Sequence, residues 1–268
     1  MRYVSLEGRK VPALGLGTWE LQGATCRDAV ATALELGYRH IDTAQGYGNE
    51  ADVGAGIDGS DREELFITTK LSTSNLSSQR VHSSTRESLD KLGSDYVDLL
   101  LIHWPAAFDR ISETLSAMVE LREAGAIRHI GVSNFTSAQL LEAARLAPVA
   151  CNQVEYHPFL GQQAVLSAAR EHDMVVTAYS PLARGAVIDD ETVNDVAEAH
   201  GVTPGQVALV WLLAQDSVMA IPKASSREHL QENLASADLA LSDDELSRLD
   251  ELERGQRIID PPSAPDWD

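Results

Sequence analysis

The feature that most constrains the fold of this chain is a short apolar segment, typical of a buried strand, that recurs eight times. These segments occupy residues 14–19, 39–44, 65–70, 97–103, 128–134, 150–156, 174–180 and 218–223. Between them residues repeat at helical spacing, as at Val81, Thr85, Leu89 and Leu92, which would share one helix face. Strands alternating with helices predict a parallel sheet, either open or closed. Eight units favour a closed (β/α)8 TIM barrel.

Several helices begin or end at recognisable signals. Four pairs have the spacing of a capping box: Thr25 with Asp28, Thr203 with Gln206, Ser225 with Glu228 and Ser242 with Glu245. Gly37 and Gly125 stand where a left-handed helix terminator is expected. Residues 4–14 predict a small β-hairpin and residues 257–268 an irregular tail. Since no linker or composition shift divides the chain, we expect a single domain over residues 1–268.

Composition narrows the cellular setting and the class of partner. No apolar run approaches the roughly 20 residues of a membrane span, and the first residues lack the apolar core of a signal peptide. Cys26 and Cys151 are the only cysteines, so neither disulfides nor a cysteine metal site is indicated. A formal charge of −20 disfavours nucleic acid and anionic membranes as partners. We expect a monomer in the cytoplasm that binds small molecules.

Chemistry is expected at the carboxyl ends of the strands, where barrel active sites lie. The residues there are polar: Asp42, Tyr47, Lys70, His103, Ser133, Asn134, Asn152, Gln153, Tyr179, Ser180 and Lys223. Each alone has an ordinary structural role available, but all of them converge on one small space. A tyrosine is a poor acid at neutral pH, and a nearby ammonium stabilises the phenolate and lowers its pKa. Tyr47 with Lys70, Asp42 and His103 therefore predicts a proton donor suited to carbonyl reduction.

Four segments extend this interpretation: "GYRHIDTAQGYGNE", "LDKLGSDYVDLLLIHWP", "IGVSNF" and "IPKASSREHLQENL". Together they resemble the signature segments of the aldo-keto reductases, and in particular their short prokaryotic members similar to 2,5-diketo-D-gluconate reductases. The resemblance covers essentially the whole chain. It implies NAD(P)H-dependent reduction of aldehydes or ketones, with Tyr47 as general acid, Lys70 and Asp42 tuning it, and His103 positioning the carbonyl.

The same resemblance implies where the coenzyme and the substrate would bind. Ser133, Asn134 and Gln153 would hold the carboxamide, Tyr179 would stack on the nicotinamide, and Ser180 and Leu182 would line the pyrophosphate path. The remaining coenzyme contacts would come from Thr18, Asp42, Lys223, Ser225, Arg227, His229, Glu232 and Asn233. The substrate pocket would be formed by Trp19, Tyr47, His103, Trp104 and Phe135, although packing explains any one aromatic equally well.

The adenosine end departs from the family pattern. Where NADPH-preferring members usually carry a serine and then an arginine, this chain has Ala224 and His229. Histidine is mostly neutral above pH 6.5 and cannot grip a phosphate with two parallel hydrogen bonds, as arginine does. We expect NADPH to be preferred only weakly, with NADH also used.

Other interpretations carry less support. The segment Gly54–Gly59 matches the G-x-G-x-x-G fingerprint, but these glycines would end a helix rather than open one, so helix packing explains them better. A metal-dependent enzyme would need clustered ligands, whereas His40, His103, His129 and His157 are scattered, so no metal is expected. A coenzyme-sensing or regulatory subunit on the same fold remains as the alternative function.

The acidic composition leads to one prediction about salt. Lys10, Lys70, Lys91 and Lys223 are the only lysines, and 41 acidic residues face 21 basic ones. We hypothesise adaptation to a salt-rich cytoplasm, where cations screen the repulsion between carboxylates. The melting temperature should therefore rise as KCl is added; a melting temperature that falls would contradict the hypothesis.

Overall fold

The structure, a computed structural model that describes residues 2–268, is an α/β fold built on a curled parallel sheet. Eight strands lie in the order β10-β9-β8-β7-β6-β5-β4-β3, every neighbouring pair being parallel. Their bounds are β3 Leu16–Gly17, β4 His40–Asp42, β5 Phe66–Leu71, β6 Val97–Ile102, β7 Ile127–Ser133, β8 Val149–Glu155, β9 Val175–Tyr179 and β10 Val218–Ala220. All eight predicted strands are confirmed, although those at the two ends of the order are short.

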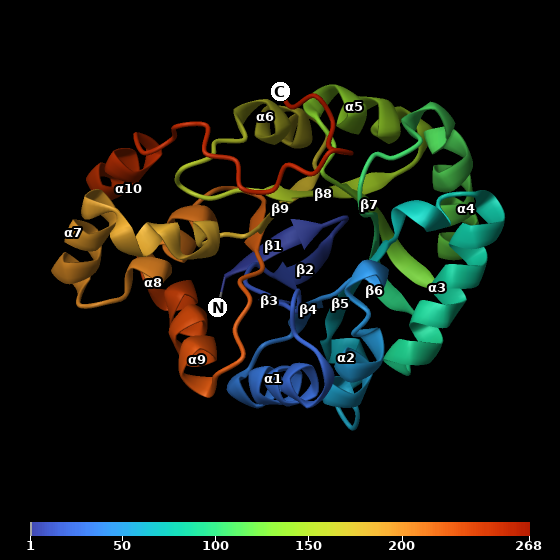
Figure 1. The fold of residues 1–268 in the computed structure, drawn as a ribbon, viewed down its shortest axis with the longest axis horizontal. Coiled ribbons are helices and arrows are strands. Elements are labelled where there is room, and N and C mark those ends of the chain that lie inside the picture. Colours follow the sequence, from blue (N-terminus) through green and yellow to red (C-terminus); the bar gives the residue numbers. More distant parts are fainter. Residues whose placement is uncertain (1) are drawn as a thin grey trace.

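The helices form a ring around the sheet (Figure 1). They are α1 Gly23–Leu36, α2 Glu50–Ile57, α3 Ser78–Leu92, α4 Ile111–Glu123, α5 Ser137–Leu146, α6 Gln163–Glu171, α7 Glu191–His200, α8 Pro204–Leu213, α9 Arg227–Ala235 and α10 Asp243–Asp250. The two end strands approach each other through backbone hydrogen bonds: Gly15 N donates to Ala220 O at 2.9 Å, and Gly17 N to Pro222 O at 3.1 Å. No helix within residues 2–268 has the length and apolarity needed to cross a membrane.

Helix ends confirm some of the sequence signals and correct others. Thr203 and Ser242 each form the predicted capping box. Thr25 does not cap a helix, because α1 already begins at Gly23 without a side-chain cap. Ser225 is also wrong by one position: Ser226 caps α9 and accepts a hydrogen bond from His229 N. The second error arises because two adjacent serines offer equally good starts.

The predicted glycine roles are confirmed. Gly37 and Gly125 have φ angles of 106° and 80°, the left-handed conformation that ends a helix. Gly54 and Gly56 lie inside α2, and a Cβ on either would fall within 3 Å of a neighbouring helix, at Lys91 O and Val30 Cβ respectively. The fingerprint-like glycines therefore serve close helix packing.

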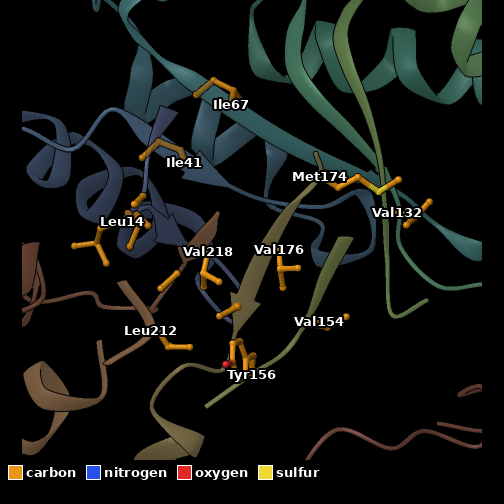
Figure 2. Close-up of a cluster of buried hydrophobic side chains, with 14 of the residues drawn as sticks. Leu14, Ile41, Ile67, Val132, Val154, Tyr156, Met174, Val176, Leu212 and Val218 are labelled. Atoms are coloured by element: carbon orange, nitrogen blue, oxygen red, sulfur yellow. The ribbon is translucent and has the colours of Figure 1, made fainter. Parts of the chain in front are cut away.

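Side chains alternate between two layers along each strand. Ile41, Ile67, Val132 and Val176 belong to the larger hydrophobic cluster between strands and helices, part of which is shown in Figure 2. Their strand neighbours point inward, and a second cluster made of Leu6, Val11, Phe66, Leu99, Leu101, Ala150, Cys151, Val175 and Met219 fills the interior. Phe66, Ala150 and Val175 of this interior cluster are the first or second residues of their strands.

The predicted hairpin contributes to this interior cluster. Strands β1 Tyr3–Leu6 and β2 Arg9–Pro12 pair antiparallel. Leu6 and Val11 pack against the interior residues, so the hairpin covers the amino-terminal end of the sheet; Figure 1 shows it inside the ring of helices.

A buried carboxylate fastens the hairpin. Asp98 on β6 is fully buried and pairs with Arg9 of β2, with Arg62 at 2.8 Å and with Arg128 at 3.4 Å. It also accepts a hydrogen bond from Ile67 N at 2.9 Å. These contacts connect the hairpin, β5 and β7 through a single side chain.

Replacing Asp98 with Asn should lower the free energy of unfolding by about 3 kcal/mol, because three arginines would lose their counter-charge. Urea denaturation measures this change. Asp95→Asn, at an exposed residue three positions earlier, is the matched control and should change stability by less than about 0.5 kcal/mol. Equal effects of the two substitutions would show that Asp98 does not hold the hairpin.

Candidate active site

Strand alternation places a polar layer above the apolar interior cluster. Lys70 lies four residues beyond Phe66 on β5, and Gln153 two residues beyond Cys151 on β8, so both point inward. Asp42, Ser133 and Tyr179 likewise come from the carboxyl ends of β4, β7 and β9. The structure thus brings the predicted strand-end residues together at the carboxyl-terminal end of the sheet.

The Lys70 ammonium is the centre of this layer. Its side chain has no exposed surface, and Nζ contacts Asp42 Oδ1 at 2.5 Å, Thr43 O at 2.9 Å and the Tyr47 hydroxyl at 3.3 Å. Burial alone would lower the pKa of Lys70, but Asp42 and Tyr47 outweigh burial and hold the pKa above its ordinary value. Lys70 is therefore charged at neutral pH.

Asp42 is itself fixed in place. Its second carboxylate oxygen accepts a hydrogen bond from Gln153 Nε2 at 2.8 Å. Its backbone oxygen accepts from the Thr18 hydroxyl at 2.9 Å. The carboxylate thus has one oxygen on the lysine and one on an amide, which leaves it little freedom to rotate.

Tyr47 lies in a short 3-10 turn, Gln45–Tyr47, between β4 and α2, and its ring is partly buried. Burial raises the pKa of Tyr47 above the ordinary value for a tyrosine, and the Lys70 ammonium offsets only part of this rise. The net direction is opposite to the one expected from the ammonium alone. Tyr47 is consequently protonated at neutral pH, and Lys70 makes its phenolate less costly than burial would otherwise allow.

His103 follows β6 and faces Tyr47, with 5.7 Å between the two ring centroids. Burial and then the positive charge of Lys70 lower the pKa of His103 to about 3. The imidazole is therefore neutral at physiological pH and can donate one N–H to an oxygen beside the tyrosine hydroxyl. Asn134 Nδ2 holds the backbone here by donating to His103 O at 2.9 Å.

Ser133, Asn134 and Tyr179 form a hydrogen-bonded group next to this centre. Asn134 Nδ2 donates to Ser133 Oγ at 3.1 Å, and the Tyr179 hydroxyl donates to Asn134 Oδ1 at 2.8 Å. Asn134 and Ser180 have φ angles of 64° and 48°, uncommon for residues other than glycine and frequent at functional sites. The amide and hydroxyl groups have the donor and acceptor chemistry that a primary carboxamide requires.

The remaining predicted coenzyme residues lie on the loop after β9 and around the start of α9. Ser180 and Leu182 are partly buried, whereas Lys223, Ser225, Arg227 and His229 are exposed. Arg227 Nη1 is paired with Glu35 Oε2 at 2.9 Å, so its charge is already partly neutralised. Asn233 is buried, Glu232 is partly buried, and Ala224 is buried without a polar group to offer.

The predicted aromatic walls differ in exposure. Trp19 is 40% exposed and Trp104 is partly buried, so both can border an open site. Phe135 has no exposed surface and packs against Phe108, with ring centroids 5.8 Å apart. A contact between Phe135 and a substrate therefore requires the neighbouring side chains to move.

Sequence reasoning missed the residues that the C-terminal tail brings to this end of the sheet. Trp267 lies edge-on to Trp104, with ring centroids 6.2 Å apart, and the Arg257 guanidinium lies 3.7 Å from the centre of the Trp267 ring. The only available signal was an aromatic residue and an arginine in a segment without periodicity. That signal does not indicate where the tail lies.

Two surface depressions of about 370 Å³ each lie elsewhere, beside α2. Both are bordered by Leu65, the residue before β5, which places them toward the amino-terminal ends of the strands. They share no residue with the polar layer. Within residues 2–268 no three His, Cys, Asp or Glu side chains are arranged to hold a metal ion.

Known proteins resemble this chain over nearly its whole length. The model of the Aldo/keto reductase family matches residues 13–254. A protein of Escherichia coli O157:H7 named methylglyoxal reductase DkgB is 42% identical over 267 residues, covering 96% of this chain and 99% of that protein. An aldo-keto reductase of Mycobacterium avium (strain 104) is 43% identical over 259 residues, covering 94% and 90%. A crystal structure provisionally described as a 2,5-diketo-D-gluconic acid reductase B has a TM-score of 0.97 at 44% identity, covering 100% and 98%.

Proposed function

This chain belongs to the aldo/keto reductase family, and from that premise we propose that it reduces aldehydes or ketones to alcohols with NAD(P)H, Tyr47 being the proton donor. One observation carries the proposal: the Tyr47 hydroxyl lies 3.3 Å from Lys70 Nζ, which itself lies 2.5 Å from Asp42. The similarity to reductases named for methylglyoxal and diketogluconic acid favours small dicarbonyl or sugar-derived substrates.

The residues of the polar layer divide the proton chemistry among them. The coenzyme, when bound, supplies the hydride to the carbonyl carbon. Negative charge then develops on the carbonyl oxygen, which receives the proton of the Tyr47 hydroxyl. Lys70 stabilises the phenolate left behind, and Asp42 keeps Lys70 charged and in place. His103, being neutral, orients the carbonyl oxygen by donating an N–H without competing as an acid.

The chain's own groups fit a nicotinamide coenzyme. Ser133, Asn134 and Gln153 would bind its carboxamide, and the partly exposed Tyr179 ring would stack on the nicotinamide. Ser180 and Leu182 would border the pyrophosphate. Lys223, Ser225 and the amino terminus of α9 would face the adenosine phosphate, where the helix dipole favours an anion.

Discrimination between NADPH and NADH is expected to be weak. Ala224 offers no hydroxyl and His229 no permanent charge. Arg227 would have to share its charge with Glu35 to reach a 2′-phosphate. These features support dual use with NADPH somewhat ahead through Lys223.

We further infer that the sheet acts as a closed (β/α)8 barrel and that residues 1–268 form one domain. The hydrogen bonds from Gly15 and Gly17 to Ala220 and Pro222 support closure. A monomer in the cytoplasm that binds neither nucleic acid nor membrane stays a prediction.

Tyr47→Phe should lower kcat for aldehyde reduction by at least about 100-fold while leaving the Kd of the coenzyme within about threefold. Lys70→Met should act similarly, because the pKa of Tyr47 would rise further without the ammonium. NADPH oxidation measures the rate and coenzyme fluorescence the Kd. Tyr3→Phe, at a hairpin tyrosine that is 58% exposed, is the control. A Tyr47→Phe enzyme with full activity would exclude Tyr47 as the donor.

The ratio of kcat/KM for NADPH to that for NADH should be below about 1000, a difference of about 4 kcal/mol. Steady-state kinetics with one aldehyde and both coenzymes measures it. His229→Arg should raise the ratio by adding a charged planar donor. A wild-type ratio above this bound would show that other residues grip the 2′-phosphate.

A further inference from the structure

The C-terminal tail, residues 251–268, crosses the carboxyl-terminal end of the sheet. Figure 1 shows it running from α10 toward α5 over this end. In mid-course Ile258 N and Ile259 N donate to the carboxylate of the buried Glu155 at 2.7 and 2.8 Å. At its end Asp268 accepts from Ser137 N at 2.7 Å and from Ser137 Oγ at 2.8 Å. The tail is thus held at two points, at the end of β8 and at the start of α5, which follows the neighbouring strand β7.

These two anchors determine where Arg257 lies. It immediately precedes Ile258, and its guanidinium stacks on Trp267, whose ring meets Trp104 edge-on. Trp104 is the residue after His103. Arg257 also lies close enough to Tyr179 for the two groups to influence each other's charge. The guanidinium therefore lies against Trp267, on the side of the sheet where its strands end and close to Trp104 and Tyr179.

Apart from its stacking contact with Trp267, the Arg257 guanidinium has no polar partner within residues 2–268. It forms no hydrogen bond and no ion pair with any residue in 2–268, and its Nη1 atom is buried without an acceptor. Leaving a charged donor group buried and unpaired is costly, so such groups are normally satisfied by a partner.

The carboxylates around Arg257 are already engaged. Glu155 accepts hydrogen bonds from the tail and from His157 Nε2, the latter at 3.0 Å. Asp260 accepts from Trp267 Nε1 at 2.9 Å, and Asp268 accepts from Ser137. They attract Arg257 over a distance, but none contacts it. An acceptor supplied from outside the chain would complete the arrangement.

We propose that Arg257 binds a carboxylate group of the substrate and that it selects anionic carbonyl compounds, such as oxo acids or oxidised sugar acids. This inference rests on the proposed reductase function. The planar guanidinium matches a carboxylate with two parallel hydrogen bonds. A chain with a formal charge of −20 does not attract small anions by its overall field, so a local cation is needed to retain one.

The position of Arg257 favours a substrate over a coenzyme phosphate as the ligand. Arg257 lies against Trp267, whose ring meets Trp104, whereas the groups expected to meet phosphates lie on the loop after β9 and at the start of α9. One of the similar proteins is named for an oxidised sugar acid and another for methylglyoxal, which has no carboxylate. Arg257 would favour the kind of substrate that carries a carboxylate over the kind that does not.

The test compares 4-carboxybenzaldehyde with its methyl ester, methyl 4-formylbenzoate, in the wild-type enzyme and in Arg257→Met. For the acid, kcat/KM should fall by about 10- to 100-fold, mainly through KM, because a charge-assisted bidentate contact is lost. For the ester it should change by less than about threefold. Equal changes for both aldehydes, or no change for either, would overturn the proposal.

Two further variants separate recognition from folding and from net charge. Arg254→Met removes the same charge from a tail arginine that already pairs with Asp190 at 3.1 Å, and it should leave the ratio of acid to ester unchanged. Arg257→Lys retains the charge but not the planar fork, and it should restore part of the preference for the acid. A fall in that ratio with Arg254→Met as large as with Arg257→Met would overturn the proposal in favour of a general charge effect.

The activity of the wild-type enzyme with the two aldehydes tests the role of Arg257 separately from the proposed reductase function. Reduction of neither aldehyde would contradict the reductase function as proposed. Reduction of the ester with no measurable reduction of the acid would contradict only the role of Arg257. Competitive inhibition by benzoate gives a second readout: its Ki should rise about 10-fold or more in Arg257→Met, and an unchanged Ki would also count against the proposal.

Discussion

The ion pair between Lys70 and Asp42 is the interaction on which the rest of the site depends. Burying either charge alone would be strongly unfavourable, and the pair becomes tolerable because Thr43 O, Tyr47 and Gln153 satisfy the remaining donors and acceptors. The sheet makes this possible by presenting β4, β5 and β8 side chains to one interior point. The same strands thus contribute apolar side chains to the interior cluster, which stabilises the fold, and polar side chains to the layer at their carboxyl ends, where the chemistry is expected.

The position of the C-terminal tail depends on a second buried carboxylate, that of Glu155, which accepts hydrogen bonds from the tail backbone. Burial would raise the pKa of Glu155, but hydrogen bonds from His157 and the tail N–H groups reverse this and hold its pKa below the usual value. The carboxylate is thereby kept charged, and a charged acceptor makes stronger hydrogen bonds to the tail backbone. Asp42 organises the proton donor, whereas Glu155 organises the segment that borders it.

Much of the fold could be predicted because each strand is a short apolar run and each run is separated from the next by a helical repeat. Thr203 and Ser242 could be identified as caps since a proline or an acidic cluster marks the first turn of their helices. Ser225 could not, because Ser226 beside it serves equally well. Asp42, Tyr47, Lys70 and His103 were accessible because strand ends can be located from the sequence. The direction of the Tyr47 pKa shift was not, because it depends on how deeply the ring is buried. Arg257 was not accessible either, since the anchors that hold its segment, Glu155 and Ser137, lie more than 100 positions away from the tail residues that they bind.

The hairpin at the amino-terminal end of the sheet also affects the direction from which ligands can bind. Leu6 and Val11 pack into the interior cluster and Arg9 pairs with Asp98, so the hairpin closes that end and ligands would have to approach the polar layer from the carboxyl-terminal end. When two ligands bind through the same open end, the one that occupies the deeper position has to bind first and dissociate last. The order in which coenzyme and substrate bind would then follow from the hairpin at the opposite end of the sheet, and not from a group that takes part in the reaction.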